Sequence, residues 1–256
     1  MKLKEVFDLT QRPAVISIVG GGGKTTTMYA LADELARDGA QVLVTTTTAF
    51  YYPDEAQVDC VIIEKEEDSL YKKLEAAFKD FNKVAAAKEF IRKDKVVGFS
   101  PDIINNLAEK RLFDYILIEA DGSRGRSLKG YRDNEPVVPK KTTHLIMVVG
   151  IDCIGKQLNE TWVHRPEVVV SAIKKSMNSI ITVNDVAQIL VHPKGFLKAL
   201  PGNAKSFVLI NKVDDNKTLE LAVELAKKVL AQQEKNINKV IIGHVREADP
   251  VISIHC

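Results

Sequence analysis

The sequence predicts an α/β protein with a doubly wound, mostly parallel sheet and helices on both of its faces. Short apolar runs rich in β-branched residues recur along the chain, and amphipathic patterns separate several of them. The runs do not alternate between apolar and polar residues. Strands covered on both faces lose that alternation, and strands that alternate with helices favour parallel pairing.

Seven runs have the character of buried strands: residues 14–19, 41–46, 59–63, 115–120, 144–149, 206–211 and 239–243. Three amphipathic segments predict helices: residues 25–39, 100–112 and 218–233. Gly39 is expected to end the first helix, because glycine adopts the left-handed conformation that helix ends favour. Ser100 is the expected N-cap of the second helix, with Pro101 at its first position.

Two segments depart from this pattern. Residues 83–98 are expected to form a β-hairpin insertion. Residues 151–204 carry few strand signals and three prolines, so we expect them to pack mainly as helices. One domain is expected to span residues 1–256.

Composition restricts the classes of function. The chain has 256 residues, of which 45% are hydrophobic, which is enough for a large core. Lys and Arg number 36 against 34 Asp and Glu, so the charge balance favours neither nucleic acid nor a membrane surface as partner. Cys60, Cys153 and Cys256 are too few and too scattered for a disulfide framework, which favours a reducing cytoplasm. No apolar run indicates a signal peptide or a membrane helix.

A glycine-rich segment follows the first predicted strand and precedes the first predicted helix. Its four glycines are Gly20, Gly21, Gly22 and Gly23. Backbone amides at such a bend can turn towards an anion without obstruction from Cβ atoms, and the helix dipole supports them. Lys24 would reach the β- and γ-phosphates, Thr25 would bind Mg²⁺, and Thr26 would reach the α-phosphate. The order of these features predicts a P-loop nucleotide-binding protein, and an ordinary glycine-rich turn is the alternative.

The match to the general P-loop pattern is incomplete, because Ile18 stands where the pattern has its first glycine. The segment fits better the G-G-x-G-K-T-T form of MinD-type, signal-recognition and dethiobiotin-synthetase-type proteins. Many of those have a second lysine at the position of Val19 that acts across a dimer. Valine cannot do so, which argues against a mechanism in which two ATPase subunits enclose the nucleotide between them.

An acidic sequence ends the predicted strand at residues 115–120. Glu119, Asp121 and Gly122 would lie near the phosphates if this strand neighbours the P-loop strand. We expect Asp121 nearer to the metal, Glu119 as its partner or as the group that orients water, and the Gly122 amide on the γ-phosphate. A surface turn after a core strand is the alternative.

Two arginines follow in a polar, glycine-punctuated loop. Arg124 and Arg126 are candidates for stabilising charge on the γ-phosphate, although solvated loop arginines are more common. Four threonines follow the second predicted strand, and one hydroxyl, of Thr47 or Thr48, is a candidate Mg²⁺ ligand. Threonine is also ordinary in strands.

The sequence Asn211–Lys212–Val213–Asp214 follows the strand at residues 206–211. Asp214 can accept hydrogen bonds from both N1–H and N2–H of guanine, which adenine does not offer in that arrangement. Lys212 can lie along the ring, and Asn211 can connect this loop to the P-loop. The sequence therefore favours GTP, with ATP as the alternative nucleotide.

Taken together, these motifs resemble the YqeC family, which is described as accessory to selenium-dependent molybdenum hydroxylases. The resemblance rests on VISIVGGGGKTT, VLVTTTTAF, EADGSRGRSLKGYRDNEPVVP, VHRPE and LINKVDD, in that order over nearly the whole chain. It implies a P-loop nucleotide-binding protein that acts in maturation of a molybdenum hydroxylase or its cofactor. It leaves the reaction undefined.

A few further residues are candidates for a second ligand or a partner. His164 and Arg165 in VHRPE could contact a molybdopterin phosphate, or the motif could be a helix cap. Lys129 and Glu135 are similar candidates. His255 and Cys256 are expected to lie in a frayed tail rather than to bind metal or selenium.

The function predicted from these observations is Mg²⁺–nucleotide binding, with GTP hydrolysis that is slow or stimulated by a partner. One alternative is a kinase or nucleotidyltransferase acting on a pterin. The other is a nucleotide-gated chaperone without turnover. The sequence does not define the oligomeric state.

Overall fold

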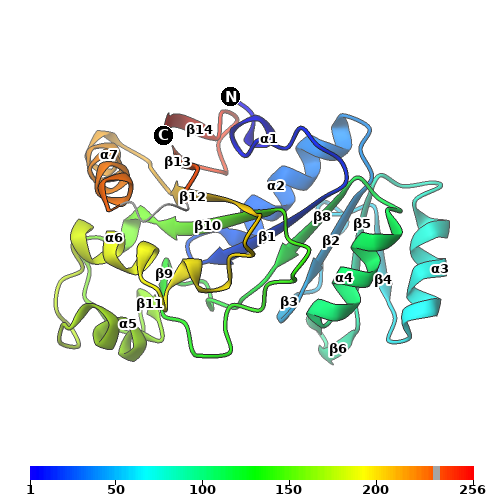
Figure 1. Ribbon diagram of the computed structural model, residues 1–256, viewed down its shortest axis with the longest axis horizontal. Helices are drawn as coiled ribbons and strands as arrows, with labels where there is room; N and C mark the ends of the chain where they lie inside the picture. Colours follow the sequence, from blue (N-terminus) through cyan, green and yellow to red (C-terminus); the bar gives the residue numbers. More distant parts are fainter. Residues whose placement is uncertain (233–236) are drawn as a thin grey trace.

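The computed structural model describes residues 1–232 and 237–256. A nine-stranded sheet, in the order β14-β13-β12-β10-β1-β8-β2-β5-β4, runs through the molecule (Figure 1). Neighbouring strands pair in parallel except β13 and β14, which are antiparallel. The predicted α/β class with a mostly parallel sheet is therefore confirmed.

The strands of this sheet are β1 (Ala14–Gly20), β2 (Val42–Thr46), β4 (Cys60–Ile63), β5 (Lys83–Ala87), β8 (Tyr115–Glu119), β10 (His144–Gly150), β12 (Lys205–Asn211), β13 (Lys239–Gly243) and β14 (Val251–His255). Two smaller sheets contain β3 (Ala49–Tyr51), β6 (Glu89–Arg92) and β7 (Lys95–Val97), and β9 (Leu128–Lys129) with β11 (Val163–His164). The helices are α1 (Leu3–Val6), α2 (Lys24–Arg37), α3 (Glu67–Ala77), α4 (Pro101–Lys110), α5 (Pro166–Ile173), α6 (Val183–Val191) and α7 (Asn216–Ala231), with 3₁₀ helices η1 (Ile151–Cys153) and η2 (Phe196–Ala199).

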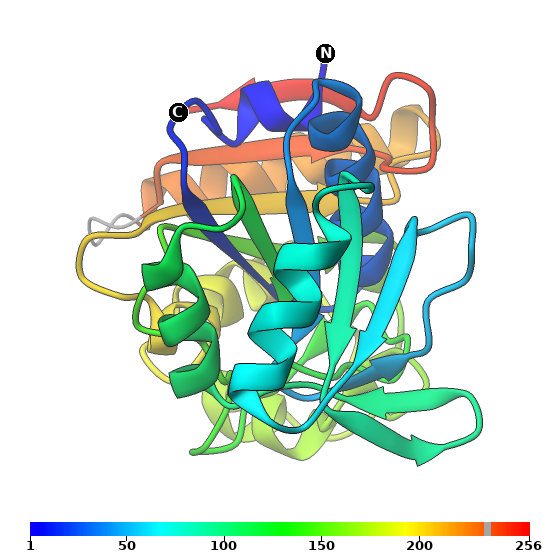
Figure 2. The same ribbon diagram turned by 90° about the vertical axis from the view of Figure 1, so that its right-hand side faces the viewer.

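Helices cover both faces of the main sheet (Figures 1 and 2). Ile16 and Ile18 of β1 pack with α1 and α2 in one buried layer. Val15 and Val19 belong to the opposite layer, which includes residues of α3, α4, α6 and α7. Successive side chains of a strand point to opposite faces, so a strand that is apolar throughout fills two cores.

The predicted helix boundaries agree closely with the structure. Ser100 caps α4 by accepting a hydrogen bond from the Ile103 amide, and Pro101 is the first helical residue. Gly39 follows the end of α2 with φ of +78°. The third predicted helix corresponds to α7, and Gln233, its last predicted residue, lies outside the described residues.

Two predictions about strands were wrong. The segment 83–98 is not one hairpin, because residues 83–87 form β5 inside the main sheet and only β6 and β7 form a hairpin, which pairs with β3. The end of the chain is not a frayed tail, because residues 251–255 pair with β13 as β14 and only Cys256 follows. Residues 151–204 are mainly helix and loop, as expected.

Among the described residues, no helix combines the length and the apolar character that crossing a bilayer requires.

Candidate nucleotide site

The candidate site lies where four neighbouring parallel strands end. β1 ends at Gly20, β8 at Glu119, β10 at Gly150 and β12 at Asn211. The chain leaves β8 on one side of β1 and enters the sheet again at β10 on the other side, so strand order reverses at β1. Open α/β sheets bind ligands at this edge and at this reversal point.

The glycine-rich turn needs glycine because other chain segments lie against it. A Cβ atom at Gly22 would lie 2.2 Å from the Gly150 amide nitrogen, and φ of Gly22 is +76°. A Cβ atom at Gly23 would lie 2.3 Å from Asn211 Nδ2, and φ there is +129°. Both the backbone conformation and the close approach exclude a side chain. The turn leads directly into α2 at Lys24.

Three of the four glycine amides are already hydrogen-bonded. Gly20 N donates to Asp121 Oδ2 at 2.9 Å. Gly21 N donates to Val148 O at 2.9 Å, and Gly22 N donates to Arg126 O at 2.8 Å. The expected anion nest over Gly20–Gly22 is thus filled by protein acceptors in this structure, and these glycines shape the turn.

The next four amides differ from these three. Across residues 1–232 and 237–256, no hydrogen bond uses the amide of Gly23, Lys24, Thr25 or Thr26. They form the first turn of a 14-residue helix, where backbone N–H groups have no partner within the helix. The available anion-binding amides therefore lie at Gly23–Thr26.

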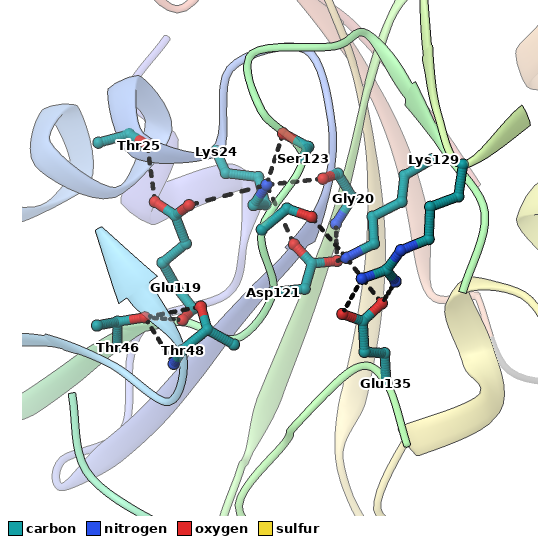
Figure 3. A network of polar contacts seen from close by, with 12 residues as sticks. Gly20, Lys24, Thr25, Thr46, Thr48, Glu119, Asp121, Ser123, Lys129 and Glu135 are labelled. Carbon is teal, nitrogen blue, oxygen red and sulfur yellow. Dashed lines mark hydrogen bonds and ion pairs between the residues drawn. The ribbon is translucent and has the colours of Figure 1, made fainter. Parts of the chain in front are cut away.

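Lys24 is the buried cation of the site, with 3% of its surface exposed. Its Nζ donates to Gly20 O at 2.7 Å and to Ser123 Oγ at 3.0 Å. It also lies 3.1 Å from Asp121 Oδ1 and 3.8 Å from Glu119 Oε1 (Figure 3). A buried ammonium group needs such partners, and phosphate oxygens could replace them.

The two carboxylates next to Lys24 have opposite pKa shifts. Burial raises the pKa of Glu119 above its ordinary value, although Lys24 and a hydrogen bond from Thr25 Oγ1 at 2.7 Å oppose that shift. Burial would also raise the pKa of Asp121, but Lys24 and Lys129 together outweigh it and lower that pKa. Asp121 is therefore the firmly ionised member of the pair.

A chain of alternating charges extends from the P-loop lysine. Lys129 Nζ lies 3.5 Å from Asp121 Oδ2 and 3.2 Å from Glu135 Oε2, and it donates to Gly122 O at 2.6 Å (Figure 3). Arg165 makes a bidentate ion pair with Glu135. These contacts connect Lys24 to Arg165 through alternating signs, so moving one charge alters the balance for its neighbours.

A cavity of about 310 Å³ adjoins the first turn of α2. Its lining residues are Gly22, Gly23, Thr26, Asp152, Asn211, Lys212, Asp214, His244 and Arg246. The expected contact between the two loops is present, because Asn211 Nδ2 donates to Gly22 O at 2.8 Å. Asp214 Oδ1 lies 2.8 Å from His244 Nδ1, and the Asp214 side chain is 63% exposed. The N-K-x-D residues therefore lie beside the helix terminus.

The two candidate threonines lie at different contacts. Thr47 Oγ1 donates to Val137 O at 2.6 Å, and Thr48 Oγ1 lies 3.2 Å from Thr46 Oγ1. Thr46 Oγ1 donates to the backbone oxygen of Glu119 at 2.7 Å. Neither Thr47 nor Thr48 has a hydrogen bond to a site carboxylate in the described part of the chain.

The two candidate arginines line a different cavity from the N-K-x-D residues. Arg124 and Arg126 border a second space of about 420 Å³, together with Gly122 and Glu135. Arg126 Nε donates to the backbone oxygen of Glu160 at 2.5 Å, and the Arg126 carbonyl accepts from Gly22. The contact of Arg126 with the P-loop is therefore made by its backbone.

Sequence reasoning missed several residues of the site. Nothing in the sequence around Ser123 marks it as a site residue, yet its hydroxyl accepts a hydrogen bond from Lys24 Nζ. Asp152 lies after β10, and its Oδ2 accepts from Lys212 Nζ at 2.9 Å. His244 and Arg246 follow β13. Their positions after parallel strands were the signal that could have identified the last three.

The residues around Thr25 fit a magnesium ion better than a metal held by protein alone. Among the described residues, no group of three His, Cys, Asp or Glu side chains could hold a metal. Mg²⁺ usually takes one or two protein ligands and completes its shell with water and phosphate oxygens. Asp121 Oδ1 is buried, and although Lys24 Nζ lies 3.1 Å away it has no partner of hydrogen-bond geometry in the described chain. That oxygen could accept from a metal-bound water.

The fold and the turn define a P-loop protein of the α/β class. The family model described as YqeC protein matches residues 16–167, which is more than half of the chain. The chain therefore belongs to the YqeC family. An Escherichia coli (strain K12) protein named Uncharacterized protein YqeC is 29% identical over 254 residues, covering 94% of this chain and 92% of that protein.

Solved structures with a related arrangement include two FtsY proteins. Chloroplast FtsY from Physcomitrella patens has a TM-score of 0.45 at 16% identity, covering 94% of this chain and 66% of that one. Cell division protein FtsY from Thermotoga maritima has a TM-score of 0.43 at 14% identity, covering 97% and 71%. This chain therefore spans about two thirds of their length. Both scores are below 0.5, so we draw nothing about function from them.

Proposed function

We propose that this protein binds a magnesium nucleoside triphosphate at the N-terminal end of α2. The observation that carries the proposal is that the unbonded amides of Gly23–Thr26 lie in the first turn of the helix that begins with Lys24. Such a terminus favours phosphate through its N–H groups and its dipole. Lys24 would exchange its contacts with Asp121 and Glu119 for phosphate oxygens, which form strong charge-assisted hydrogen bonds.

The proposed metal position is next to Thr25. Its hydroxyl already contacts Glu119, and Asp121 Oδ1 is a buried oxygen without a hydrogen bond among the described residues. Bound Mg²⁺ would neutralise charge on the phosphate oxygens. Asp121 would hold metal-bound water. Glu119, whose pKa is raised, would orient the attacking water and accept its proton. The hydroxyl of Thr47 or Thr48, between β2 and β3, is proposed as a second candidate ligand.

We propose guanine as the base. Asp214 would accept the two N–H groups of guanine, Lys212 would lie along the ring, and Asn211 would keep their loop attached to the P-loop. These residues line the cavity beside the helix terminus. The proposal is GTP binding with slow or partner-stimulated hydrolysis, and preference for ATP would be the contrary result.

The wider role is proposed on family resemblance alone. We propose that nucleotide binding assists maturation of a selenium-dependent molybdenum hydroxylase or of its cofactor. A cytoplasmic location is part of this proposal, and the scattered cysteines favour it. Deleting the gene in its native host should lower hydroxylase activity while leaving the hydroxylase polypeptide present, as measured by enzyme assay and immunoblot.

Calorimetry with each magnesium nucleotide tests the binding proposal. Lys24→Met should weaken binding by roughly 100-fold or more, because a charge-assisted phosphate contact is lost at a desolvated site. Lys83→Met is the matched control, since Lys83 is also a buried lysine paired with a carboxylate, Asp33, but belongs to β5. It should bind nucleotide as the wild type does.

A second variant tests the site even if Lys24→Met fails to fold. Thr25→Val retains the ion pairs of Lys24 and should weaken binding mainly in the presence of Mg²⁺. No heat from wild-type protein with any nucleotide would overturn the proposal, as would equal affinity in the wild type and Lys24→Met.

A further inference from the structure

The second cavity lies beside the proposed nucleotide site and is formed by segments far apart in the sequence. Its volume is about 420 Å³, within the range of about 300–1,000 Å³ for small-molecule sites. Its basic lining residues are Lys95, Arg124, Arg126, Arg132, His164 and Arg165. Gly122, between the two residues that contact Lys24, also lines it.

Cationic side chains outnumber carboxylates in this cavity, five to three. Glu135 is already balanced by Lys129 and Arg165. Glu160 and Glu167 lower the positive potential, but Glu167 lies in the first turn of α5, where the helix dipole offsets its charge. Within residues 1–232 and 237–256, Arg124 and Arg132 form no ion pair, and both are exposed. Two unpaired guanidinium groups at a concave surface suit a phosphate group.

The pKa of His164 depends on the positive charges around the cavity. Burial, together with the charges of Lys129, Arg165 and Arg124, lowers its pKa to about 4, while Glu135 opposes them. The imidazole is therefore neutral at pH 7 and can donate or accept a hydrogen bond. An anion bound among these cations would raise the pKa of His164.

The cavity is also connected to the P-loop lysine. Lys129 contacts both Asp121, a partner of Lys24, and Glu135, a lining residue of the cavity. One loop, residues 122–130, carries Arg124 and Arg126 and also accepts a hydrogen bond from Gly22 through the Arg126 carbonyl. A molecule in this cavity would therefore lie next to the phosphate end of a bound nucleotide.

We propose that this cavity binds the phosphate group of a small phosphorylated molecule that acts as a second substrate. The proposal rests on the proposed function, because a second substrate has meaning only beside a bound nucleotide. Arg124 and Arg132 would hold the phosphate by charge-assisted hydrogen bonds, and His164 would donate to it. The rest of the cavity is large enough for an organic group attached to that phosphate.

Titration with phosphate probes in the absence of nucleotide tests the site separately. The probes are inorganic phosphate and phenyl phosphate, and the proteins are the wild type and Lys24→Met. Both proteins should bind phenyl phosphate, and more tightly than inorganic phosphate. The double variant Arg124→Gln/Arg132→Gln should weaken binding on the order of tenfold or more, because two charge-assisted contacts are lost. Arg246→Gln is the control, because Arg246 lines the other cavity.

The imidazole signal of His164, followed by NMR, supplies a second measurement. Its pKa should rise when phenyl phosphate binds to the wild type and stay unchanged in the double variant. Equal probe affinity in the wild type and the double variant would overturn the proposal. So would loss of all probe binding in Lys24→Met, which would place the phosphate at the P-loop, and binding of inorganic phosphate alone.

These outcomes separate this proposal from the nucleotide proposal. Probe binding that depends on Arg124 and Arg132 in a protein that binds no nucleotide would leave an anion site and reject the nucleotide function. Nucleotide binding without such probe binding would support the nucleotide function and reject the anion site.

Discussion

Asp121 and Glu119 are two residues apart on the same strand end, yet they hold different partners. Asp121 contacts the Gly20 amide, Lys24 and Lys129. Glu119 accepts a close hydrogen bond from Thr25 and lies further from Lys24. The pKa is lowered at Asp121 and raised at Glu119, so the first is the structural counter-charge for two lysines and the second is the carboxyl suited to proton transfer.

Replacing the two carboxylates should therefore have unequal effects on stability. Asp121→Asn leaves two buried lysines short of a counter-charge and should lower the free energy of unfolding by about 3–5 kcal/mol. Glu119→Gln keeps a hydrogen-bond acceptor for Thr25 and removes a costly buried charge, so it should change stability much less. Urea unfolding at pH 7 measures both. A larger loss in Glu119→Gln would contradict this assignment.

Base preference should depend on Asp214. Asp214→Asn replaces an acceptor by a donor, so preference should shift from GTP towards XTP by roughly 100-fold or more in calorimetric affinity. Asp215→Asn is the neighbouring control: Asp215 caps α7 by accepting from Thr218 N at 2.7 Å, and asparagine caps equally well. Unchanged preference in Asp214→Asn would reject guanine recognition by this residue.

His144 should make stability depend on pH. It is 6% exposed, and burial, with Lys205, lowers its pKa to about 4, against the opposing effect of Asp8. The unfolded chain, with a histidine pKa near 6.5, therefore binds more protons between about pH 4 and 6.5, and stability falls as pH falls through that range. The full effect is on the order of 3 kcal/mol.

The measurement is urea unfolding between pH 7 and 5, above the range where most carboxylates titrate. His144→Gln should make this part of the profile flatter. His164, whose pKa is lowered to about 4, leaves a residual slope of the same sign. His192→Gln, outside the buried core, is the control. An equally steep profile in His144→Gln would show that other groups cause the slope.

Among the elements, the segment at residues 122–130, which includes β9, contacts several parts of the site. Its Arg126 carbonyl accepts from the P-loop. Its Ser127 hydroxyl accepts from Lys212 Nζ at 2.8 Å, and the Ser127 carbonyl accepts from the Gly150 amide at 3.0 Å. Its arginine side chains line the second cavity. This segment is therefore placed to contact both proposed ligands.

The glycine-rich turn at residues 20–23 is the second element on which the site depends. Comparing Gly22 in this turn with Gly39 after α2 separates the effect of a positive φ from the effect of close packing. Gly22→Ala combines a positive φ with a Cβ atom 2.2 Å from the Gly150 amide, whereas Gly39→Ala has a similar φ of +78° and nothing within 4 Å. Gly39→Ala should lower the free energy of unfolding by about 1–2 kcal/mol through backbone strain alone. Gly22→Ala should lower it further and should also abolish nucleotide binding.

Urea unfolding and calorimetry measure these two effects. Similar stability losses in both variants would mean that the approach of Gly150 to the turn does not restrict position 22. Wild-type nucleotide affinity in Gly22→Ala would mean that the turn can shift without disturbing the first turn of α2.

At the scale of the whole molecule, the sheet brings segments from all parts of the chain to one edge. Gly20, Glu119, Gly150 and Asn211 are the ends of four adjacent strands, and buried layers on both faces hold those strands in place. The chain of charges connects Lys24 with Glu135 and Arg165, which line the second cavity. A change of partner at Lys24 should therefore alter the charge balance of the residues that line the second cavity.

Hydrogen exchange should reveal this coupling. Magnesium nucleotide should increase amide protection at residues 23–26, through phosphate contacts, and change it at residues 122–135, through Asp121 and Lys129. β4 serves as an internal control, since it lies at the edge of the sheet with β2 and β5 between it and β8, the nearest site strand. In Lys24→Met both changes should be absent. Protection confined to residues 23–26 would indicate that the cavities are independent.

Local sequence patterns predicted most strands of the main sheet, the helix after the P-loop and one helix cap. The seven predicted strands, β1 among them, follow from apolar runs, α2 follows from an amphipathic pattern, and the cap at Ser100 follows from residue type. β5 was missed because its sequence, KVAAA, has little of the β-branched bulk that marks strands. Its alanines suit a position between β2 and β4 that only the assembled sheet creates.

The amino-acid sequence by itself determined the strand–turn–helix unit around Lys24, the acidic end of β8 and the N-K-x-D loop, because each depends on neighbours within a few residues. Only the tertiary structure decided which amides remain free, since the acceptors for Gly20–Gly22 come from Asp121, Val148 and Arg126. It likewise placed Arg124 and Arg126 on a second cavity. Contacts between distant segments arise from strand order, which no local pattern of residues encodes.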